Sequence, residues 1–485
     1  MNKKMLTSDH PVEECGLFGV YGADPAMPLI YQGLFSLQHR GQEGAGIVVS
    51  DGKQLSSSKG QGLVSEVFAN VSAKKLQGHM GIGHVRYSTT GSTRIQNVQP
   101  LVVECVDGLW AVAHNGNLVN ASKLRRMYQE AGAIFQTSTD SEVLVHLLAD
   151  PLYRNRPQRV ARALGELSGA FAFLIMTREC VMACRDPNGF RPLSIGKLGN
   201  AWVFASETCA LKQVGAEYIR DVNPGELVVA DATGLHSSTF AEQAAGALSQ
   251  CVFEMVYFAR PDSHVFGMNV HQVRMAYGAR LAEEHPVDAD IVVAVPDSGN
   301  SAALGYSRRS GIPLDFGFIR NHYIGRTFIM PEQDQRSQGV DLKLAVVDEV
   351  VQGKRVIVVD DSIVRGTTAR RRVMRLREAG AREVHVRISS PPTAHPCFYG
   401  IDFPTRDELI AGNQDVDSIC AFLGADSLGY ISIDGLLSPF PDKQNFCKAC
   451  FSGEYPVEPG ETGCKKALET YSGELPFMNK TERNI

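Results

Sequence analysis

Two neighbouring carboxylates, Asp360 and Asp361, lie where an apolar run gives way to a polar loop. The run, residues 356–359, is β-branched throughout, as expected of a buried parallel strand. The loop continues through Arg365, Gly366, Thr367 and Thr368 into a helix-forming stretch. The first N–H groups of a helix suit a phosphate, and adjacent acids suit sugar hydroxyls or Mg²⁺. This segment therefore predicts a binding site for a sugar phosphate.

A second apolar run, residues 291–295, leads into the loop 296–301, which carries Asp297, Ser298 and Gly299. The small residues leave backbone N–H groups exposed for another phosphate group. Ser298 also offers an oxygen that could join Asp360 and Asp361 around Mg²⁺. Because ligands of open α/β sheets bind beyond the carboxyl ends of the strands, we expect the two loops to meet at one edge of a parallel sheet.

Cys15 directly precedes the apolar stretch 16–20. A thiol at the first position of a chain can use its own α-amine, whose pKa is roughly 7.7 to 8.0, as a general base. That chemistry requires removal of residues 1–14, which we predict to be a propeptide. Taken alone, the residue would be a small buried hydrophobe.

Four further segments near the N-terminus combine glycine with polar residues at the ends of short apolar runs: 37–47, 83–91, 113–120 and 139–142. Loops of this kind converge over a sheet sandwich. In this order, and with the segment that begins at Cys15, they resemble the class II glutamine amidotransferase domain. That domain is an N-terminal-nucleophile (Ntn) hydrolase with an α+β sandwich fold, and the resemblance covers roughly residues 15–245.

The resemblance implies a role for each of five residues. Cys15 attacks the side-chain amide of glutamine, while the Asn115 side chain and the Gly116 N–H stabilise the tetrahedral oxyanion. Arg86 holds the α-carboxylate of glutamine, and Asp140 accepts from its α-ammonium group.

The segment around the two carboxylates resembles the phosphoribosyl pyrophosphate (PRPP) motif of type I phosphoribosyltransferases, which have an α/β fold. This resemblance implies that PRPP is bound by Asp297, Ser298, Gly299, Asp360, Asp361, Arg365, Gly366, Thr367 and Thr368. The polar segment 320–344 lacks sustained periodicity and lies between the two loops in the sequence. We expect it to be a lid that brings Arg326 and Lys343 to the pyrophosphate.

The rest of the chain supplies the supporting elements. Alternating strands are expected over 165–232, an amphipathic helix over 275–285, and an apolar strand over 383–392 that completes a βαβ succession. The helix after the PRPP motif is expected to place a solvated face at Arg370, Arg371, Arg372, Arg375 and Arg377. With a boundary near 241–250, the expected organisation is a propeptide (1–14), an amidotransferase domain (15–250) and a phosphoribosyltransferase domain (251–485).

The cysteines raise a separate question. Cys447 and Cys450 form a CxxC pair, which by spacing alone fits zinc, a redox pair or an iron-sulfur centre equally. Both halves together resemble the glutamine PRPP amidotransferase family, one subgroup of which has a propeptide and a [4Fe-4S] cluster. That resemblance implies cluster ligation by Cys251, Cys397, Cys447 and Cys450. It also implies glutamine and PRPP as substrates, purine nucleotides as feedback inhibitors, and a homo-oligomer, either a tetramer or a dimer.

Composition excludes several classes of protein. The chain has 485 residues, of which 44% are hydrophobic and 21% charged, so it can bury more than one core. A net charge of -5 disfavours a nucleic-acid partner. No apolar run approaches the roughly 20 residues of a membrane span, and the polar N-terminus lacks a signal-peptide core, so we expect a cytoplasmic protein.

The expected function is the amidotransferase reaction that opens de novo purine synthesis. One alternative is an amidotransferase with another acceptor, such as an asparagine or glucosamine-phosphate synthase. However, neither an ATP-pyrophosphatase SGG loop nor sugar-isomerase repeats are found. A second alternative is a PRPP-sensing regulator, which should carry a basic helix-turn-helix and lack Cys15.

Overall fold

The computed structural model describes residues 15–87, 94–154, 158–242, 248–321, 344–403 and 405–460. These residues form two compact units. The N-terminal unit contains residues 15–250 together with the short segments 398–401 and 455–460, and the C-terminal unit contains 251–397 and 402–454. The expected domain 251–485 therefore differs from the C-terminal unit in these two short segments.

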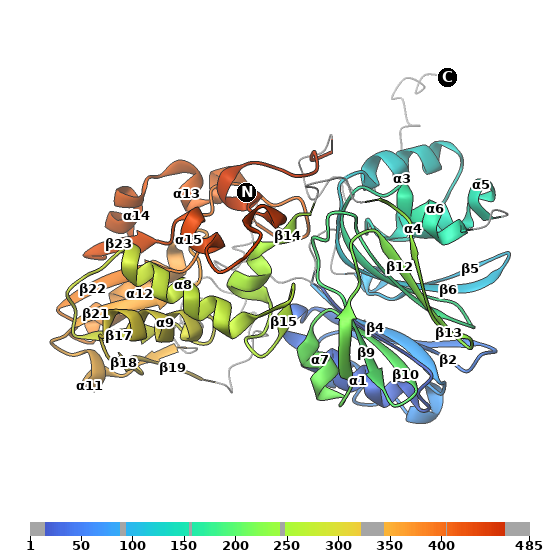
Figure 1. Cartoon of the computed structure of the whole chain (residues 1–485), viewed down its shortest axis with the longest axis horizontal. Helices are drawn as coiled ribbons and strands as arrows, with labels where there is room; N and C mark the ends of the chain where they lie inside the picture. The colour runs from blue at the N-terminus through green and yellow to red at the C-terminus, as the bar shows by residue number, and fades with distance from the viewer. Residues whose placement is uncertain are drawn as a thin grey trace, which may run out of the picture. The chain divides into compact units, whose positions relative to one another are not determined.

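The N-terminal unit contains two antiparallel sheets (Figure 1). The first sheet has the strand order β11 (Glu217–Asp221), β9 (Ser194–Leu198), β10 (Ala201–Ala205), β1 (Gly16–Tyr21), β4 (Met80–Arg86), β2 (Gly44–Ser50) and β3 (Leu55–Gln61). The second has the order β13 (Gly234–Thr239), β12 (Glu226–Asp231), β8 (Val181–Arg185), β7 (Gly169–Met176), β6 (Gly108–Leu118) and β5 (Leu101–Cys105).

The two sheets pack face to face and helices cover their outer faces. Because side chains alternate along a strand, Leu17 of β1 enters the core between the sheets, whereas Phe18 and Val20 face the helical layer. The first sheet is covered by α1 (Ala26–Ser36), α2 (Val64–Val67) and α7 (Thr208–Gln213). The second is covered by α3 (Ala121–Glu130), α4 (Glu142–Ala149) and α6 (Arg159–Gly165), and α5 (Pro151–Arg154) lies between α4 and α6 in the chain. This is the expected α+β sandwich.

The C-terminal unit is built on a parallel sheet. Its order is β18 (Leu314–Asp315), β17 (Ile291–Ala294), β21 (Arg355–Asp360), β22 (Glu383–Ile388) and β23 (Ser427–Tyr430), and all of its pairings are parallel. Strand β21 is buried on both faces, which explains its continuous β-branched run. The larger helices are α8 (Val270–Glu284), α9 (Asn300–Ser310), α12 (Thr367–Glu378) and α14 (Val416–Leu423).

Helices α8 and α9 cross with their backbones in contact. A methyl carbon on Gly278 of α8 would lie 1.8 Å from the carbonyl oxygen of Ala302, and one on Gly305 of α9 would lie 2.0 Å from that of Met275. Glycine at both positions allows α9 to pack closely on α8, and α9 in turn contacts β17 and β21. The crossing therefore fixes the start of α9, which follows the loop 296–299.

Smaller elements complete this unit. Helices α11 (Asp348–Val351), α13 (Ile410–Asn413), α15 (Ile433–Leu437) and α16 (Ala449–Ser452) are short. Three strand pairs are β14 (Gln250–Cys251) with β24 (Phe446–Cys447), β15 (His264–Val265) with β16 (Met268–Asn269), and β19 (Phe318–Arg320) with β20 (Leu344–Val346). Across the described ranges, no helix has both the length and the hydropathy needed to cross a membrane.

Candidate active site

Cys15 lies at one end of the sandwich, immediately before β1. In the antiparallel pairing of β1 with β4, Gly16 is opposite Val85, so Arg86 ends its strand beside the start of the cysteine strand. Arg86 is buried, and the Cys15 thiol donates to the carbonyl oxygen of Tyr87 over 3.6 Å. The structure thus brings the predicted nucleophile and the predicted carboxylate-binding arginine to one place.

The backbone of Cys15 is held by a buried ion pair that sequence reasoning missed. Arg40 Nε donates to the Cys15 carbonyl oxygen over 3.1 Å, and Arg40 Nη1 lies 2.7 Å from Glu207 Oε1. His39 Nε2 reaches the same carboxylate oxygen at 2.7 Å. Arg40 and Glu207 are fully buried, so breaking the pair would leave an uncompensated charge. Glu207 is far from Arg40 in the sequence, and the residues around it give no indication of this pairing.

Asn115 and Gly116 lie near the end of β6. Asn115 is buried, and neither atom of its side-chain amide has a hydrogen-bond partner within the described ranges. An unsatisfied buried amide costs about 1–3 kcal/mol, so a ligand group is the natural partner. Gly116 has φ +142, and a methyl carbon there would lie 2.0 Å from the carbonyl oxygen of Ala170, so glycine is required.

His84 and His114 connect the two sheets at this end. His84, on β4, is two residues before Arg86, and its Nε2 lies 3.0 Å from the carbonyl oxygen of His114 on β6. Since Asn115 follows His114, the oxyanion candidates lie at the same end of the sandwich as Cys15.

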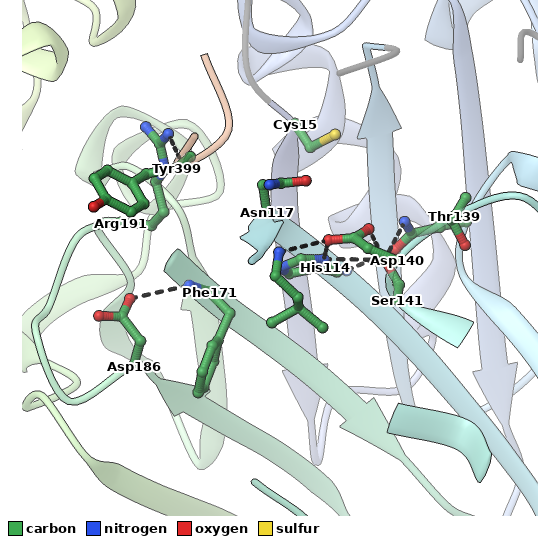
Figure 2. Close-up of polar contacts among 12 residues, drawn as sticks. Cys15, His114, Asn117, Thr139, Asp140, Ser141, Phe171, Asp186, Arg191 and Tyr399 are labelled. Carbon is green, nitrogen blue, oxygen red and sulfur yellow. Dashed lines mark hydrogen bonds and ion pairs between the residues drawn. The ribbon is translucent and has the colours of Figure 1, made fainter. Parts of the chain in front are cut away.

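Asp140 belongs to a buried polar network (Figure 2). Its carboxylate accepts from Leu118 N at 2.9 Å and from Ser141 Oγ at 3.2 Å, and lies 3.6 Å from His114 Nδ1. Burial by itself would raise the pKa of Asp140, but the charge of His114 and these hydrogen bonds outweigh it and lower the pKa. Asp140 therefore stays ionised, as a partner for an α-ammonium group must.

His114 is itself fixed by residues that sequence reasoning missed. Its backbone N–H donates to Gln99 Oε1 over 2.7 Å, and Gln99 Nε2 donates to Ser141 Oγ over 3.1 Å. Ser141 Oγ is 3.0 Å from His114 Nδ1. The histidine ring also stacks on Phe173, with 4.3 Å between ring centroids. These contacts fix the position of the residue that precedes Asn115.

In the C-terminal unit, the two predicted phosphate loops lie at one edge of the parallel sheet. Strands β17 and β21 are neighbours, with Ala294 opposite Val359, so the loops after them start side by side. The Ser298 side chain is close enough to the Asp361 carboxyl to lower its pKa, so the two loops lie next to each other. A methyl carbon on Gly299 would lie 2.5 Å from the carbonyl oxygen of Val359, which shows how closely the first loop approaches β21.

The two carboxylates have different surroundings. Asp360 accepts from the backbone N–H of Asp361 over 3.0 Å and forms a buried ion pair with Arg372. Asp361 is fully buried, and its Oδ2 has no partner within the part of the chain that the structure describes. Burial and the adjacent charge of Asp360 raise the pKa of Asp361 to about 7. An unsatisfied buried oxygen of this kind fits a cation or a sugar hydroxyl.

The ion pair corrects one expectation. Arg372 was expected on a solvated face of its helix, but it is buried against Asp360. The helix begins at Thr367, one residue after Gly366, whose φ is +80. Because the helix begins at Thr367, Arg372 lies on the face of the helix that points toward β21.

The other predicted PRPP residues are placed as follows. Thr367 and Thr368 form the first turn of α12, where the backbone N–H groups of a helix point out from its end. Arg365 Nη2 lies 3.6 Å from Glu408 Oε2. Asp297 is exposed and forms an ion pair with Arg320, which sequence reasoning missed. The lid candidate, with Arg326 and Lys343, lies outside the described residues, as does the expected propeptide.

The four predicted cluster cysteines gather in the C-terminal unit. Strand β14, which contains Cys251, pairs with β24, which contains Cys447. The carbonyl oxygen of Cys450 accepts from the N–H groups of Ala394 and His395, just before Cys397. Burial and the nearby thiols of Cys397, Cys447 and Cys251 raise the pKa of Cys450 well above its ordinary value.

As placed, no three histidine, cysteine, aspartate or glutamate side chains among the described residues are arranged to hold a single metal ion. A [4Fe-4S] cluster makes a different demand, because its four cysteines each bind a different iron and need not converge on one point.

Comparison with known proteins identifies the family. Over 452 residues the chain is 52% identical to the amidophosphoribosyltransferase of Bacillus subtilis (strain 168), covering 92% of this chain and 94% of that protein. The chain belongs to the amidophosphoribosyltransferase family. Amidophosphoribosyltransferase 1 of Arabidopsis thaliana, a chloroplastic protein, is 50% identical over 94% of this chain and 81% of its own length. A family model described as glutamine amidotransferase domain matches residues 84–213.

Solved structures of the amidophosphoribosyltransferase family agree with this fold. The B. subtilis glutamine PRPP amidotransferase complexed with ADP and GMP superposes with a TM-score of 0.86 at 50% identity, over 92% of this chain and 98% of that one. A second structure, described as the allosteric regulatory enzyme of purine biosynthesis, gives 0.87 over 94% and 100%. The expected Ntn hydrolase sandwich followed by a type I phosphoribosyltransferase fold is therefore confirmed.

Proposed function

We propose that this chain makes 5-phosphoribosylamine from PRPP with glutamine as nitrogen donor, the first step of de novo purine synthesis. One observation carries the proposal: the buried amide of Asn115, which has no hydrogen-bond partner among the described residues, lies at the same end of the sandwich as Cys15 and Arg86. Family membership and the paired strand-end loops of the C-terminal unit support the second half of the reaction.

In the first half-reaction, the Cys15 thiolate attacks the amide carbon of glutamine. The Asn115 side chain and the Gly116 N–H stabilise the oxyanion, Arg86 holds the α-carboxylate and Asp140 the α-ammonium group. The carbon–nitrogen bond then breaks as the nitrogen takes up a proton, which releases ammonia and leaves a thioester on Cys15. Water hydrolyses the thioester, giving glutamate and the free thiol.

In the second half-reaction, ammonia attacks C1 of PRPP, and the bond from C1 to the pyrophosphate oxygen breaks. The N–H groups at the start of α12 and the hydroxyls of Thr367 and Thr368 bind the 5-phosphate. Arg365 and Gly366 complete this phosphate loop. Ser298 and Gly299, in the loop that begins with Asp297, bind the pyrophosphate together with Arg326 and Lys343. The two carboxylates bind the ribose hydroxyls.

Magnesium belongs to this proposal. Asp361 Oδ2, which has no partner in the described part of the chain, and the oxygens of the adjacent Ser298 and Asp360 are the hard donors that Mg²⁺ prefers. The chemistry that bound Mg²⁺ supplies is neutralisation of charge on the departing pyrophosphate. Asp361 must give up its proton to bind the ion, because burial raises its pKa to about 7.

A [4Fe-4S] cluster held by Cys251, Cys397, Cys447 and Cys450 is also proposed. Three buried thiols and the half-buried thiol of Cys447, whose charges would repel one another, fit a cationic centre, because burying like charges together is costly. The cluster's contribution is structural: it ties together segments far apart in the sequence and transfers no electron.

Anaerobic purification followed by iron, zinc and sulfide analysis tests the cluster. We expect about four irons and four sulfides per chain. Cys450→Ser should lose them, whereas Cys420→Ser, a thiol of the same unit outside the set, should keep them. A zinc-loaded or metal-free protein with full activity and unchanged stability would contradict the proposal.

Other parts of the proposal rest on the family alone. Residues 1–14 are removed so that the α-amine of Cys15 can act as base, which N-terminal sequencing of active protein checks. The chain forms a homo-oligomer, a tetramer or a dimer, measurable by light scattering. Purine nucleotides inhibit it, in keeping with the ADP and GMP complex of the B. subtilis relative. The cytoplasmic location stays a prediction.

An isotope experiment tests the reaction itself. With amide-¹⁵N glutamine and PRPP, the label should appear in phosphoribosylamine, with one glutamate and one pyrophosphate formed per turnover. Cys15→Ala should abolish this activity but keep synthesis from ammonium salts, while Cys105→Ala serves as the matched control. Label transferred to an acceptor other than PRPP would support the rival amidotransferases.

A further inference from the structure

Two segments from the C-terminal half of the sequence pack on the end of β6. They are Phe398–Ile401 and residues 455–460, and both belong to the N-terminal unit although the residues that precede each of them do not. We call them the return segments. The chain covers the strand that carries Asn115 and Gly116 with residues that lie hundreds of positions later.

The first return segment contacts the backbone of Gly116 directly. A methyl carbon on Gly400, whose φ is +110, would lie 3.1 Å from the carbonyl carbon of Gly116 and 3.2 Å from its Cα. One residue further along β6, Asn117 Nδ2 donates to the carbonyl oxygen of Phe398 over 2.9 Å. Gly116 Cα and the peptide group that follows it are therefore bounded by this segment.

A buried arginine holds the segment in place. Arg191 is fully buried and donates to the carbonyl oxygen of Tyr399 (Figure 2). The preceding residue, Phe190, stacks on the Tyr399 ring with 4.5 Å between centroids. The same Arg191 guanidinium lies 2.9 Å from the position of a methyl carbon on Gly400, so Gly400 is packed against both Arg191 and Gly116.

The loop that carries Arg191 is anchored to the strand next to Gly116. Asp186 accepts from the N–H groups of Asn188 and Phe190, which shapes the loop, and from Phe171 N over 3.0 Å. Phe171 is the partner of Gly116 in the ladder between β6 and β7. Gly116 is thus held between a strand on one side and the return segment on the other.

The second return segment locks the first. The Tyr399 hydroxyl donates to the carbonyl oxygen of Val457 and accepts from Val457 N over 3.0 Å. The Tyr455 ring meets that of Phe398 with centroids 5.1 Å apart.

We propose that the first return segment, clamped by Arg191, positions the Gly116 peptide as an oxyanion donor, so that Gly400 and Arg191 are positioning residues for glutamine hydrolysis. The inference rests on the proposed function, in which the Gly116 N–H stabilises the oxyanion. An oxyanion donor must point at the oxygen of the tetrahedral intermediate. A small displacement of its peptide therefore weakens the hydrogen bond in the transition state more than any contact with the bound substrate. The segment therefore acts on kcat and leaves glutamine binding nearly unchanged.

The test uses the full chain with Gly400→Ala, and Gly234→Ala as its control. Gly234 has φ +131 and nothing within 4 Å of an added methyl carbon, so this control carries the backbone strain without the contact. We expect Gly400→Ala to lower kcat for glutamine hydrolysis at least about tenfold, with KM changed less than about threefold. Synthesis from ammonium salts should stay within about twofold of wild type.

A second readout separates positioning from a structural defect. The aldehyde analogue of glutamine, glutamate γ-semialdehyde, forms a tetrahedral adduct with Cys15 whose oxygen takes the oxyanion position, whereas iodoacetamide alkylates the same thiol without one. Gly400→Ala should lower the affinity for the aldehyde by the same factor by which it lowers kcat/KM, and it should leave the rate of alkylation by iodoacetamide unchanged.

Arg191→Lys gives an independent arm if Gly400→Ala does not fold. Lysine keeps one N–H donor for the Tyr399 carbonyl oxygen but lacks the planar guanidinium group, so we expect an intermediate loss of kcat. Methionine has no donor, so the loss should be larger in Arg191→Met. Equal kcat values for Gly400→Ala and Gly234→Ala, or for Arg191→Met and wild type, would overturn the proposal. A wild-type chain that does not hydrolyse glutamine would instead contradict the proposed function.

Discussion

Arg372 on α12 forms a buried ion pair with Asp360, the last residue of β21. The arginine gives Asp360 a buried counter-ion, and the two acids sit at the centre of the proposed PRPP site. Because a buried ion pair is costly to break from one side, Arg372 matters to folding and binding alike.

We predict that Arg372→Leu lowers the free energy of unfolding of the C-terminal unit by about 3–5 kcal/mol, because it leaves Asp360 buried without its counter-ion. Arg375→Leu, on the exposed side of the same helix, should cost less than about 1 kcal/mol. Both tryptophans of the chain, Trp110 and Trp202, lie in the N-terminal unit. Urea unfolding followed by circular dichroism should therefore show the loss, and equal midpoints for the two variants would contradict it.

The crossing of α8 and α9 should not tolerate a methyl group. Gly278→Ala places a carbon 1.8 Å from a backbone oxygen, so the helices must separate, at a cost of about 1–3 kcal/mol or more. Gly165→Ala, at the end of α6 with nothing within 4 Å, is the control and should be neutral or slightly stabilising. Thermal unfolding compares them. Since α9 follows the pyrophosphate loop, KM for PRPP should also rise in Gly278→Ala alone.

His84 gives a pH-dependent prediction for the N-terminal unit. Burial lowers the pKa of His84 to about 3, so it stays neutral in the folded chain when an unfolded histidine, with a pKa near 6.5, takes up a proton. Below pH 6.5 the unfolded state binds more protons, and this contribution to stability falls with falling pH by about 1.4 kcal/mol per unit. His84→Gln should remove that slope.

Tryptophan fluorescence in urea at pH 7, 6 and 5 measures the effect. The difference in unfolding free energy between wild type and His84→Gln should shift in favour of the variant by about 1 kcal/mol between pH 6 and pH 5. Parallel stability curves for the two proteins would show that His84 is not the group responsible.

Asp361 provides a prediction about ligand binding. Asp361→Asn keeps the size of the side chain but removes the charge that Mg²⁺ and the ribose hydroxyls require, so PRPP affinity should fall at least about tenfold. Basal glutamine hydrolysis should persist, because Cys15 and its partners belong to the other unit. Calorimetric titration with Mg²⁺ and PRPP provides the measurement, and Asp348→Asn is a suitable surface control. Unchanged PRPP affinity would remove Asp361 from the site.

Local segments were predictable from sequence and distant pairings were not. The strand, carboxylates and loop from Val356 to Thr368 could be recognised because strand, loop and helix are contiguous and each residue type has a local reason. The partners Arg372 and Glu207 could not, since their positions depend on how a helix winds and on a contact across the fold. The hydrogen bond between Asn117 and Phe398 spans most of the chain and leaves no periodicity to detect.

The return segments have a consequence for dissecting the molecule. A fragment that stops at residue 250 would leave out residues 398–401 and 455–460, and so expose the side of β6 that they cover. Its glutamine site would lose its cover even though every residue named for the first half-reaction were present. The two halves of the sequence therefore do not function independently. The N-terminal half expressed alone should hydrolyse glutamine poorly, and its activity should recover when a peptide that contains residues 398–401 is added.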